Sequence, residues 1–353
     1  MKHTDIIKSL SLEQKCALLS GGTVFTTRAL PGKGIPAITL SDGPNGVRKQ
    51  AGAADHLGLN PSVPATCFPT SATVANSWDP ELGEAVGAAM GEEAAAQGVS
   101  VLLGPGLNIK RSPLCGRNFE YFSEDPYLAG KMAAAYVRGI QKNGIAACPK
   151  HFAVNSQELR RMASDSIVDE RTLREIYLTG FEIAVKEGHP RSIMSSYNLV
   201  NGTYANENKH LLMEILRGEW GFDGAVITDY CDHHSYMNGD QALRAGGSLW
   251  MAGFTGGAMA FETGSNSYLK ALRRATKEAL YMYLHVRVTN RDYADSIGDT
   301  TALRHAFTTS AFGWRHLVAL IDIVAVALFA LAVRGVVIDV KLRKAAKTEK
   351  KNS

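Results

Sequence analysis

Short apolar runs alternate with helical segments along the first 255 residues, and this alternation most constrains the fold. Runs with the composition of buried strands stand at 35–41, 99–103, 145–148, 192–196 and 225–228. Strands that alternate with helices predict an α/β protein with a parallel sheet. Polar residues follow these strands rather than precede them. This favours a (β/α)8 TIM-like barrel over a doubly wound sheet, because a barrel carries its chemistry on the loops after its strands.

The number of strands leaves the predicted barrel irregular or incomplete. Further short strands at 68–76 and 248–251 bring the total to about seven. No G-x-G-x-x-G follows the first strand, which weakens a dinucleotide-binding alternative. The pattern predicts helices at 11–19, 79–97, 126–143, 169–187, 208–220 and 268–284. Ser11 and Gln14 predict a capping box at the start of the first of these helices.

Composition and charge exclude several classes of protein. The 353 residues carry a formal net charge of +4, and much of it lies in the basic tail after Val340, so nucleic acid is not indicated as a partner. The five cysteines form no C-x-x-C pair, so neither a disulfide framework nor a zinc site is predicted. Asp232, His233 and His234 are adjacent, and adjacent residues rarely converge on one ion. We therefore expect no metal and no cofactor.

The C-terminal part of the chain predicts attachment to a membrane. An apolar run at 317–333, interrupted only by Asp322, would rise ~26 Å as a helix, and it can extend past a snorkelling Arg334. We expect a single-pass membrane protein with its basic end in the cytoplasm, although the N-terminus is not a signal peptide and the side of the catalytic domain stays open. A buried core helix is the alternative, given the two charges. The expected division is a barrel at 1–255, a helix and linker at 256–312, an anchor at 313–340 and a tail at 341–353.

The side chains able to do chemistry arrive at the ends of successive strands. They are Asp42, Arg117, Lys150, His151, Tyr197 and Asp229. Asp229 ends the apolar run 225–228, and an acid there costs free energy unless it is solvated, paired or used. We interpret Asp229 as a carboxylate nucleophile.

Each of the other residues also has a purely structural interpretation. Asp42 could build a turn, and Tyr197 could serve in packing. A lone histidine such as His151 is more often a core residue than a catalytic one. Arg117 could pair with Glu120 or Glu124. Lys150 could instead form a Schiff base, which would make the protein an aldolase.

The ordered set of motifs resembles the catalytic barrel of family 3 glycoside hydrolases of the β-glucosidase type. The motifs are SDGPNGVR at 41–48, GRNFEY at 116–121, PKHF at 149–152, NSQE at 155–158, MSSYN at 194–198 and GFDGAVITD at 221–229. The resemblance covers about residues 10–255. It implies that Asp229 is the nucleophile of a retaining mechanism. It also implies a sugar subsite, built by Asp42, Arg117, Lys150, His151, Met194 and Tyr197. Tyr230 stands where the family usually has a tryptophan.

Retaining hydrolysis also needs a second carboxyl as acid/base, and the resemblance implies that an α/β sandwich domain supplies this glutamate. No such domain is predicted here, so we expect the acid/base from another chain or segment. The first hypothesis is a membrane-anchored β-glycosidase acting on a β-linked oligosaccharide or aryl glycoside. The second is a catalytically incomplete sugar-binding membrane protein. The third is the lysine-dependent aldolase.

Overall fold

The computed structural model describes residues 4–52, 55, 59–231, 237–251, 264–289, 323 and 334. The chain divides into two compact units, Met1–Asp299 and Thr300–Ser353, and the boundary expected at residue 255 falls inside the first. The anchor and tail expected at 313–353 lie outside the described residues, apart from Ile323 and Arg334. Among the helices that are described, none is both long enough and apolar enough to cross a membrane.

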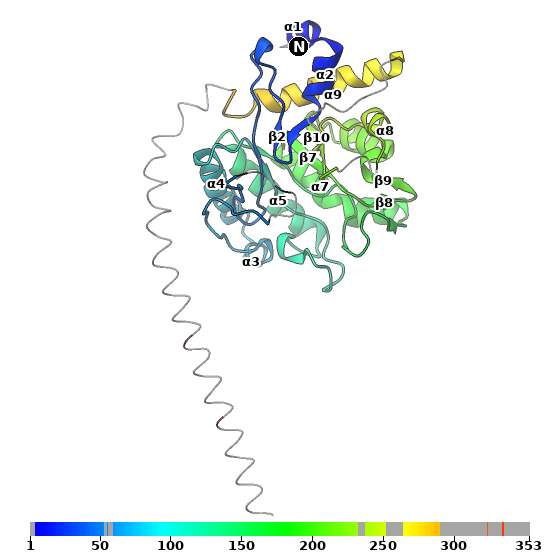
Figure 1. The fold of residues 1–353 in the computed structure, drawn as a ribbon. Helices are drawn as coiled ribbons and strands as arrows, with labels where there is room; N and C mark the ends of the chain where they lie inside the picture. The colour runs from blue at the N-terminus through cyan, green and yellow to red at the C-terminus, as the bar shows by residue number, and fades with distance from the viewer. Residues whose placement is uncertain are drawn as a thin grey trace, which may run out of the picture. The chain divides into compact units, whose positions relative to one another are not determined.

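The first unit is a TIM-like barrel, and most of its strands are parallel (Figure 1). One parallel sheet contains β3 (Leu40–Asp42), β4 (Val101–Leu103) and β5 (Ala146–Ala147), and a second pairs β7 (Ser192–Ser195) with β10 (Ala225–Thr228). A parallel bridge between Phe152 and Ser195 joins the two sheets. The strand predicted at 225–228 is thus confirmed with its bounds, and those predicted at 99–103, 145–148 and 192–196 are confirmed in a shorter form. The strand predicted at 35–41 is present only at its end, as β3.

The barrel wall continues from β10 through residues 249–250 to the N-terminal segment. Thr228 N donates to Leu249 O (2.9 Å), and Trp250 N donates to Leu19 O (2.9 Å). Gly21 N in turn donates to Trp250 O (2.8 Å). The strand predicted at 248–251 is therefore reduced to isolated bridges, but these bridges still occupy a place in the barrel wall.

An antiparallel hairpin completes the ring. It consists of β1 (Gly21–Thr23) and β2 (Thr26–Thr27), and Leu40 N donates to Phe25 O (2.8 Å) to join the hairpin to β3. This hairpin was not predicted from the sequence. The barrel is irregular, as expected, because a hairpin takes the place of regular βα units.

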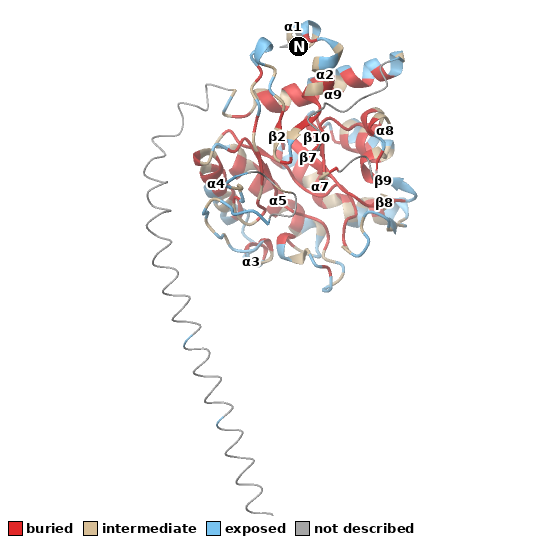
Figure 2. Ribbon diagram, viewed as in Figure 1, coloured by how far each residue is buried: buried red, intermediate tan, exposed pale blue. Residues whose placement is uncertain are grey.

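The strands are buried on both faces, which explains their nearly continuous apolar sequences (Figure 2). Alternate residues enter different clusters because successive side chains of a strand point to opposite faces. One cluster contains Val101, Leu103, Ala146, Met194 and Ile227, together with residues of α2 (Leu12–Leu18) and α9 (Asn266–Leu284). The other contains Leu102, Ala147, Ile193 and Val226, together with residues of α4 (Pro80–Ala96) and α5 (Pro126–Gln141).

The helices largely agree with the sequence pattern. They are α1 (Thr4–Ser9), α2 (Leu12–Leu18), α3 (Ser71–Ala75), α4 (Pro80–Ala96), α5 (Pro126–Gln141), α6 (Glu170–Thr172), α7 (Thr179–Ile183), α8 (Gly239–Ala245) and α9 (Asn266–Leu284). Wider π-type turns form η3 (Leu173–Leu178), η4 (Ala184–Gly188) and η6 (His210–Glu219), and tighter turns form η1 (Pro31–Lys33), η2 (Asn118–Glu120) and η5 (Ala205–Glu207). A small outer sheet contains β6 (Asp165–Ser166), β8 (Leu199–Val200) and β9 (Thr203–Tyr204). The predicted capping box of α2 is confirmed.

One predicted strand is wrong. Residues 68–76 contain the helix α3 instead, because the Thr70 side chain accepts a hydrogen bond from Thr73 N and starts a helical turn.

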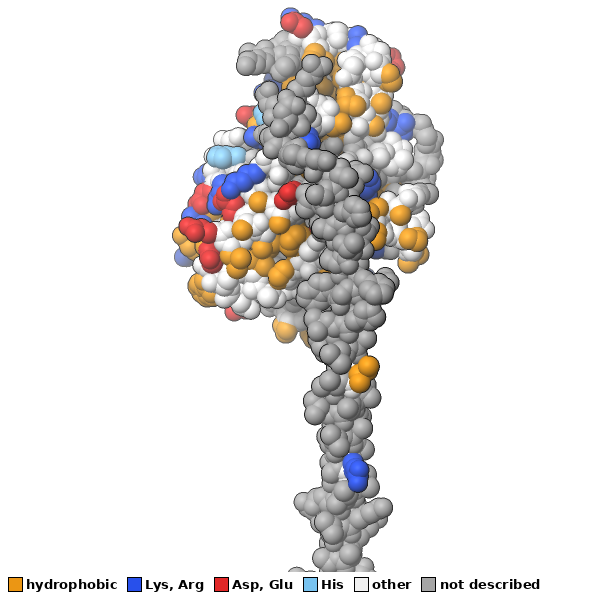
Figure 3. Space-filling view, turned by 90° about the vertical axis from the view of Figure 1, so that its left-hand side faces the viewer, with side chains coloured by type: hydrophobic (Ala, Val, Ile, Leu, Met, Phe, Trp, Pro, Cys, Tyr) orange, Lys and Arg blue, Asp and Glu red, His pale blue; other side chains and the backbone are white. Residues whose placement is uncertain are grey.

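On the surface, acidic and basic side chains are interspersed with hydrophobic ones on the face shown in Figure 3. The described residues on that face form no continuous patch of one sign.

Candidate active site

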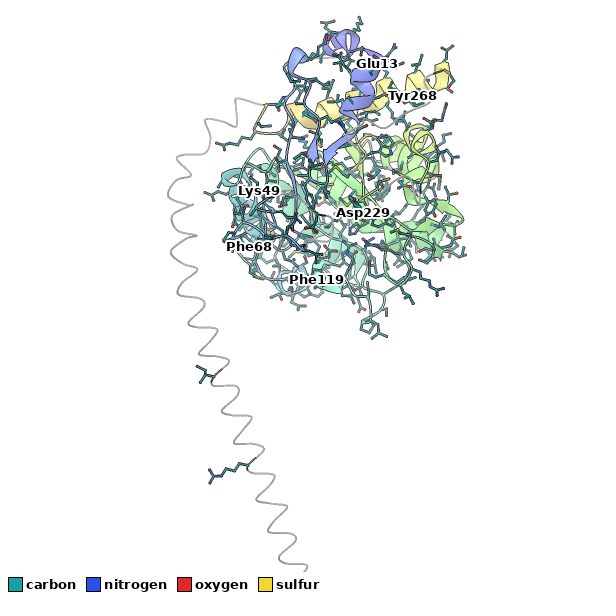
Figure 4. The ribbon with its side chains drawn as sticks, viewed as in Figure 1. Glu13, Lys49, Phe68, Phe119, Asp229 and Tyr268 are labelled. Atoms are coloured by element: carbon teal, nitrogen blue, oxygen red, sulfur yellow. The ribbon has the colours of Figure 1, made fainter. Side chains whose placement is uncertain are left out.

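The barrel topology brings the predicted site residues to the carboxyl ends of its strands. Asp42 is the last residue of β3, and Asp229 follows β10 directly. Lys150 and Tyr121 each form a β-bridge to Gly106. The loop that carries Arg117 therefore folds back onto the segment that follows β5. Figure 4 shows Asp229 near the middle of the domain. This is the edge at which TIM barrels place their active sites.

A chain of ion pairs crosses this edge. Lys150 Nζ lies 2.7 Å from Asp42 Oδ1 and 3.5 Å from Glu120 Oε2. Arg117 Nε lies 2.5 Å from Glu120 Oε1, so the pairing with Glu120 that the sequence left open is present. The Lys150 and Glu120 side chains are only 3% and 4% exposed, so they interact with little solvent screening.

The charge state of Lys150 follows from these partners. Burial lowers the pKa of the ammonium, but Asp42 and Glu120 outweigh burial, and the pKa lies above its usual value. Burial likewise raises the pKa of the Asp42 carboxyl, and Lys150 reverses this, so that the pKa is lowered. Lys150 is therefore a charged donor at neutral pH. This argues against the aldolase hypothesis, because a Schiff base forms only from a neutral amine.

His151 is held from three directions. Its Nε2 lies 2.8 Å from Arg117 Nη2, and its Nδ1 lies 3.2 Å from Tyr121 Oη. Asn108 fixes its backbone by accepting from His151 N (2.7 Å) and donating to His151 O (2.9 Å). Burial, followed by the nearby cations, holds the pKa of His151 well below its usual value. A guanidinium can only donate, so Nε2 accepts and the neutral ring carries its proton on Nδ1.

Asp229 is the acid closest to this histidine. Its Oδ2 lies 3.6 Å from His151 Nε2, and its Oδ1 accepts from Tyr230 N (2.7 Å). The side chain is 15% exposed, so a small molecule at the barrel mouth can reach it. Burial raises the pKa of Asp229, while Arg117 and Arg161 oppose this rise.

Tyr197 contacts the backbone next to Asp229. Tyr197 Oη donates to Tyr230 O (2.6 Å), which fixes the backbone immediately after Asp229. Burial, and after it the charge of Asp229, raises the pKa of Tyr197, so the phenol stays protonated. Met194 is buried in the same apolar cluster as Tyr197. The structure thus brings six of the seven predicted site residues to one edge of the barrel, and the seventh, Met194, lies within β7.

Several residues of this edge were not predicted from the sequence. The Arg161 guanidinium lies 4.4 Å from the centre of the Tyr197 ring, and Arg161 Nη1 lies 2.9 Å from Glu158 Oε2. Tyr121 and Asn108, which hold His151, were not selected either. Glu120 and Tyr121 stand inside the GRNFEY motif and could have been found there. No spacing signal in the sequence marked Arg161.

Two cavities in the described part of the structure are lined by none of the predicted site residues. One of about 470 Å³ is lined by residues that include Arg111, Gln157 and Asp165, and the other lies beside Ile35 and Val288. Residues 232–236, which contain the two adjacent histidines, lie outside the described residues. Within the part of the chain that is described, no group of three His, Cys, Asp or Glu side chains could hold a metal ion.

Comparison with known proteins identifies the family. The profile described as the glycosyl hydrolase family 3 N terminal domain matches residues 50–272. The chain belongs to glycoside hydrolase family 3. It is 57% identical over 225 residues to thermostable beta-glucosidase B of Acetivibrio thermocellus, covering 64% of this chain and 30% of that protein. It is 49% identical over 229 residues to an exo-alpha-(1->6)-L-arabinopyranosidase of Bifidobacterium longum, covering 65% of this chain and 30% of the relative.

Solved structures of the family have the same fold. Beta-glucosidase 3B from Thermotoga neapolitana in complex with glucose superimposes with a TM-score of 0.73 at 38% sequence identity. The match covers 86% of this chain and 45% of that one. The family 3 chain described here therefore spans less than half the length of these relatives.

Proposed function

We propose that this barrel is the nucleophile-bearing part of a retaining β-glycosidase, with a terminal β-linked glucoside as the substrate class. The observation that carries the proposal is the position of Asp229 at the barrel mouth, 3.6 Å from His151 and influenced electrostatically by Arg117 and Arg161. Its carboxylate would attack the anomeric carbon and form a glycosyl-enzyme, which water then releases. The name of the Acetivibrio relative, a beta-glucosidase, supports this substrate class.

The sugar would be bound by hydrogen-bond donors and acceptors that lie at this edge of the barrel. Asp42 accepts hydroxyl protons, and Lys150 and Arg117 donate to hydroxyl oxygens. His151 Nε2, the nitrogen beside Asp229, already accepts from Arg117 and so orients that guanidinium in the subsite. Relatives named for glucose and for arabinopyranose share this part of the chain, so sugar specificity would also depend on residues outside the shared motifs.

We further propose that the acid/base comes from outside these residues. Glu120 is paired with Arg117 and Lys150, and Glu158 is paired with Arg161. Both carboxylates are thus already engaged with cations, and neither is free to face a leaving-group oxygen. A partner domain of the kind that the family resemblance implies would supply the missing glutamate at the barrel mouth.

A 2-deoxy-2-fluoro glucoside with a dinitrophenolate leaving group tests the nucleophile, because such a leaving group departs without protonation. We expect intact-mass spectrometry to show one covalent fluoroglucosyl adduct and peptide mapping to place it on Asp229. Asp229→Ala removes the adduct, whereas Asp223→Asn, a change at an exposed acid nearby, retains it. A folded protein that binds glucose but never becomes labelled would instead be a sugar-binding protein.

We also propose that residues 313–340 attach the protein to a membrane through the apolar run at 317–333. Membrane flotation of the full chain and of a chain ending at Asp299 tests this. We expect only the full chain to float with the lipid. Equal behaviour of the two chains would refute the anchor.

A further inference from the structure

We propose that Glu120 is a positioning residue that holds Lys150 and Arg117, the two cations of the sugar subsite, in their working places. This inference rests on the proposed function, because those two side chains matter only if a sugar binds between them. Glu120 contacts one cation with each carboxylate oxygen, at 2.5 Å from Arg117 Nε and 3.5 Å from Lys150 Nζ. It is itself only 3% exposed.

The turn that carries Glu120 is rigid. Glu120 N donates to Arg117 O (3.1 Å), and Asn45 Nδ2 donates to Phe119 O (3.1 Å), which ties η2 to the loop after β3. Phe119 points outward and is 59% exposed, whereas Glu120 points inward. Figure 4 shows Phe119 at the edge of the domain below Asp229. The turn therefore presents its carboxylate to the site at a fixed position.

The charges around Glu120 show why a carboxylate is needed there. Arg117 and Lys150 are both cations, and each lowers the tendency of the other to stay charged. Glu120 offsets this repulsion, and Asp42 does so from the opposite side of Lys150. The remaining groups facing this pair are neutral His151, the Tyr121 phenol, Glu158 and Asp229.

A neutral side chain of the same shape separates charge from packing. In Glu120→Gln we expect glucose, measured by calorimetry at pH 7, to bind about tenfold more weakly, because two charge-assisted contacts are lost. We also expect Lys150 to react with acetic anhydride at lower pH than in the wild type, since its pKa falls when a neighbouring carboxylate is removed. Peptide mass spectrometry at several pH values measures this reaction.

Two further variants complete the experiment. Glu124→Gln removes an exposed acid from the same loop and should change neither measurement. Glu120→Asp keeps the charge but shortens the side chain, and we expect a wild-type acetylation profile with intermediate affinity. If Glu120→Gln folds and leaves both the affinity and the profile unchanged, the inference is wrong.

The outcomes separate this inference from the proposed function. If Glu120→Gln does not fold, Glu120→Asp decides: weaker binding by the folded variant supports the inference, and unchanged binding refutes it. If the wild type itself binds no glucose and is not labelled, the proposed function fails. The acetylation profile of Lys150 then still tests whether Glu120 controls that lysine.

Discussion

Asp229 lies where burial and nearby cations act on its charge in opposite directions. Burial raises the pKa of the carboxyl, and Arg117 and Arg161 only partly reverse the rise. The folded protein therefore retains a proton on Asp229 at pH values where the unfolded chain has lost it. Ionisation at neutral pH consequently reduces the stability of the fold.

The first prediction concerns stability and pH. Asp229→Asn should increase the free energy of unfolding at pH 7 by on the order of 1 kcal/mol, as is common when a charged active-site group is neutralised. The gain should disappear below the pKa of Asp229 in the unfolded chain, about 3.9, because the carboxyl is then protonated in both states. Urea denaturation at pH 7 and pH 3 measures both values. A variant less stable than the wild type at pH 7 would contradict the prediction.

The second prediction concerns Arg161, which lowers the pKa of Asp229. Arg161→Met removes this cation, so the carboxylate should form only at higher pH. The acidic limb of the pH profile for fluoroglucoside labelling should therefore move to higher pH. Arg160→Met, at the exposed neighbouring position, serves as the control and should leave the limb in place. An unmoved limb in Arg161→Met would show that this guanidinium does not influence the nucleophile.

At the scale of elements, α4 and α5 pack closely because glycines lie between them. A Cβ added at Gly87 would lie 2.6 Å from Tyr136 O, and one added at Gly139 would lie 2.2 Å from Glu84 O. Such distances leave no room for a methyl group without moving one helix. The helices can therefore approach this closely only while these positions remain glycine.

The third prediction uses this contact. Alanine normally favours a helix over glycine by about 1 kcal/mol. Gly87→Ala should nevertheless destabilise the protein by about 2 kcal/mol, because overpacking outweighs the helix preference. Gly218→Ala, at an exposed position of η6, should not destabilise the protein and should show the helix preference as a gain of up to about 1 kcal/mol. Urea denaturation compares the two, and equal stability of both variants would contradict the close packing.

The elements also show what could be predicted from the sequence. Short apolar runs that follow a glycine turn, such as 225–228, were predictable because consecutive apolar residues are buried on both faces only in an interior strand. Residues 68–76 were misassigned since Thr and Val favour strands, whereas the cap at Thr70 decides for a helix. The hairpin of β1 and β2 was missed because its short polar strands are held by partners distant in sequence.

The site was predictable to a different degree. Asp42 ends β3, Asp229 follows β10 directly, and Lys150 and His151 come shortly after β5, so the barrel topology alone brings them together. The contacts that tune them depend on how loops fold. Arg161 reaches the Tyr197 ring from such a loop, and no local pattern encodes that approach.

At the scale of the whole molecule, the barrel closes through its N-terminal hairpin. The fourth prediction is that the amide hydrogens of Trp250, Gly21 and Leu40, which form this seam, exchange as slowly as those within β7 and β10. Hydrogen exchange followed by mass spectrometry or NMR measures this. Exchange within seconds at the seam, with slow exchange elsewhere, would mean that the barrel opens along this line.

The seam has a consequence for how the chain reaches its native state. Residues 19–21 pair with Trp250, so this early segment of the barrel wall stays unpaired until a segment far along the chain has been synthesised. The ring cannot close during translation until residue 250 has left the ribosome, and pairing between such distant segments is intrinsically slow. Until then the apolar residues of α2 and the hairpin cannot be buried against the complete barrel. These residues therefore stay exposed to aggregation until residue 250 is available, and a chaperone that binds residues 12–27 would act where protection is needed longest.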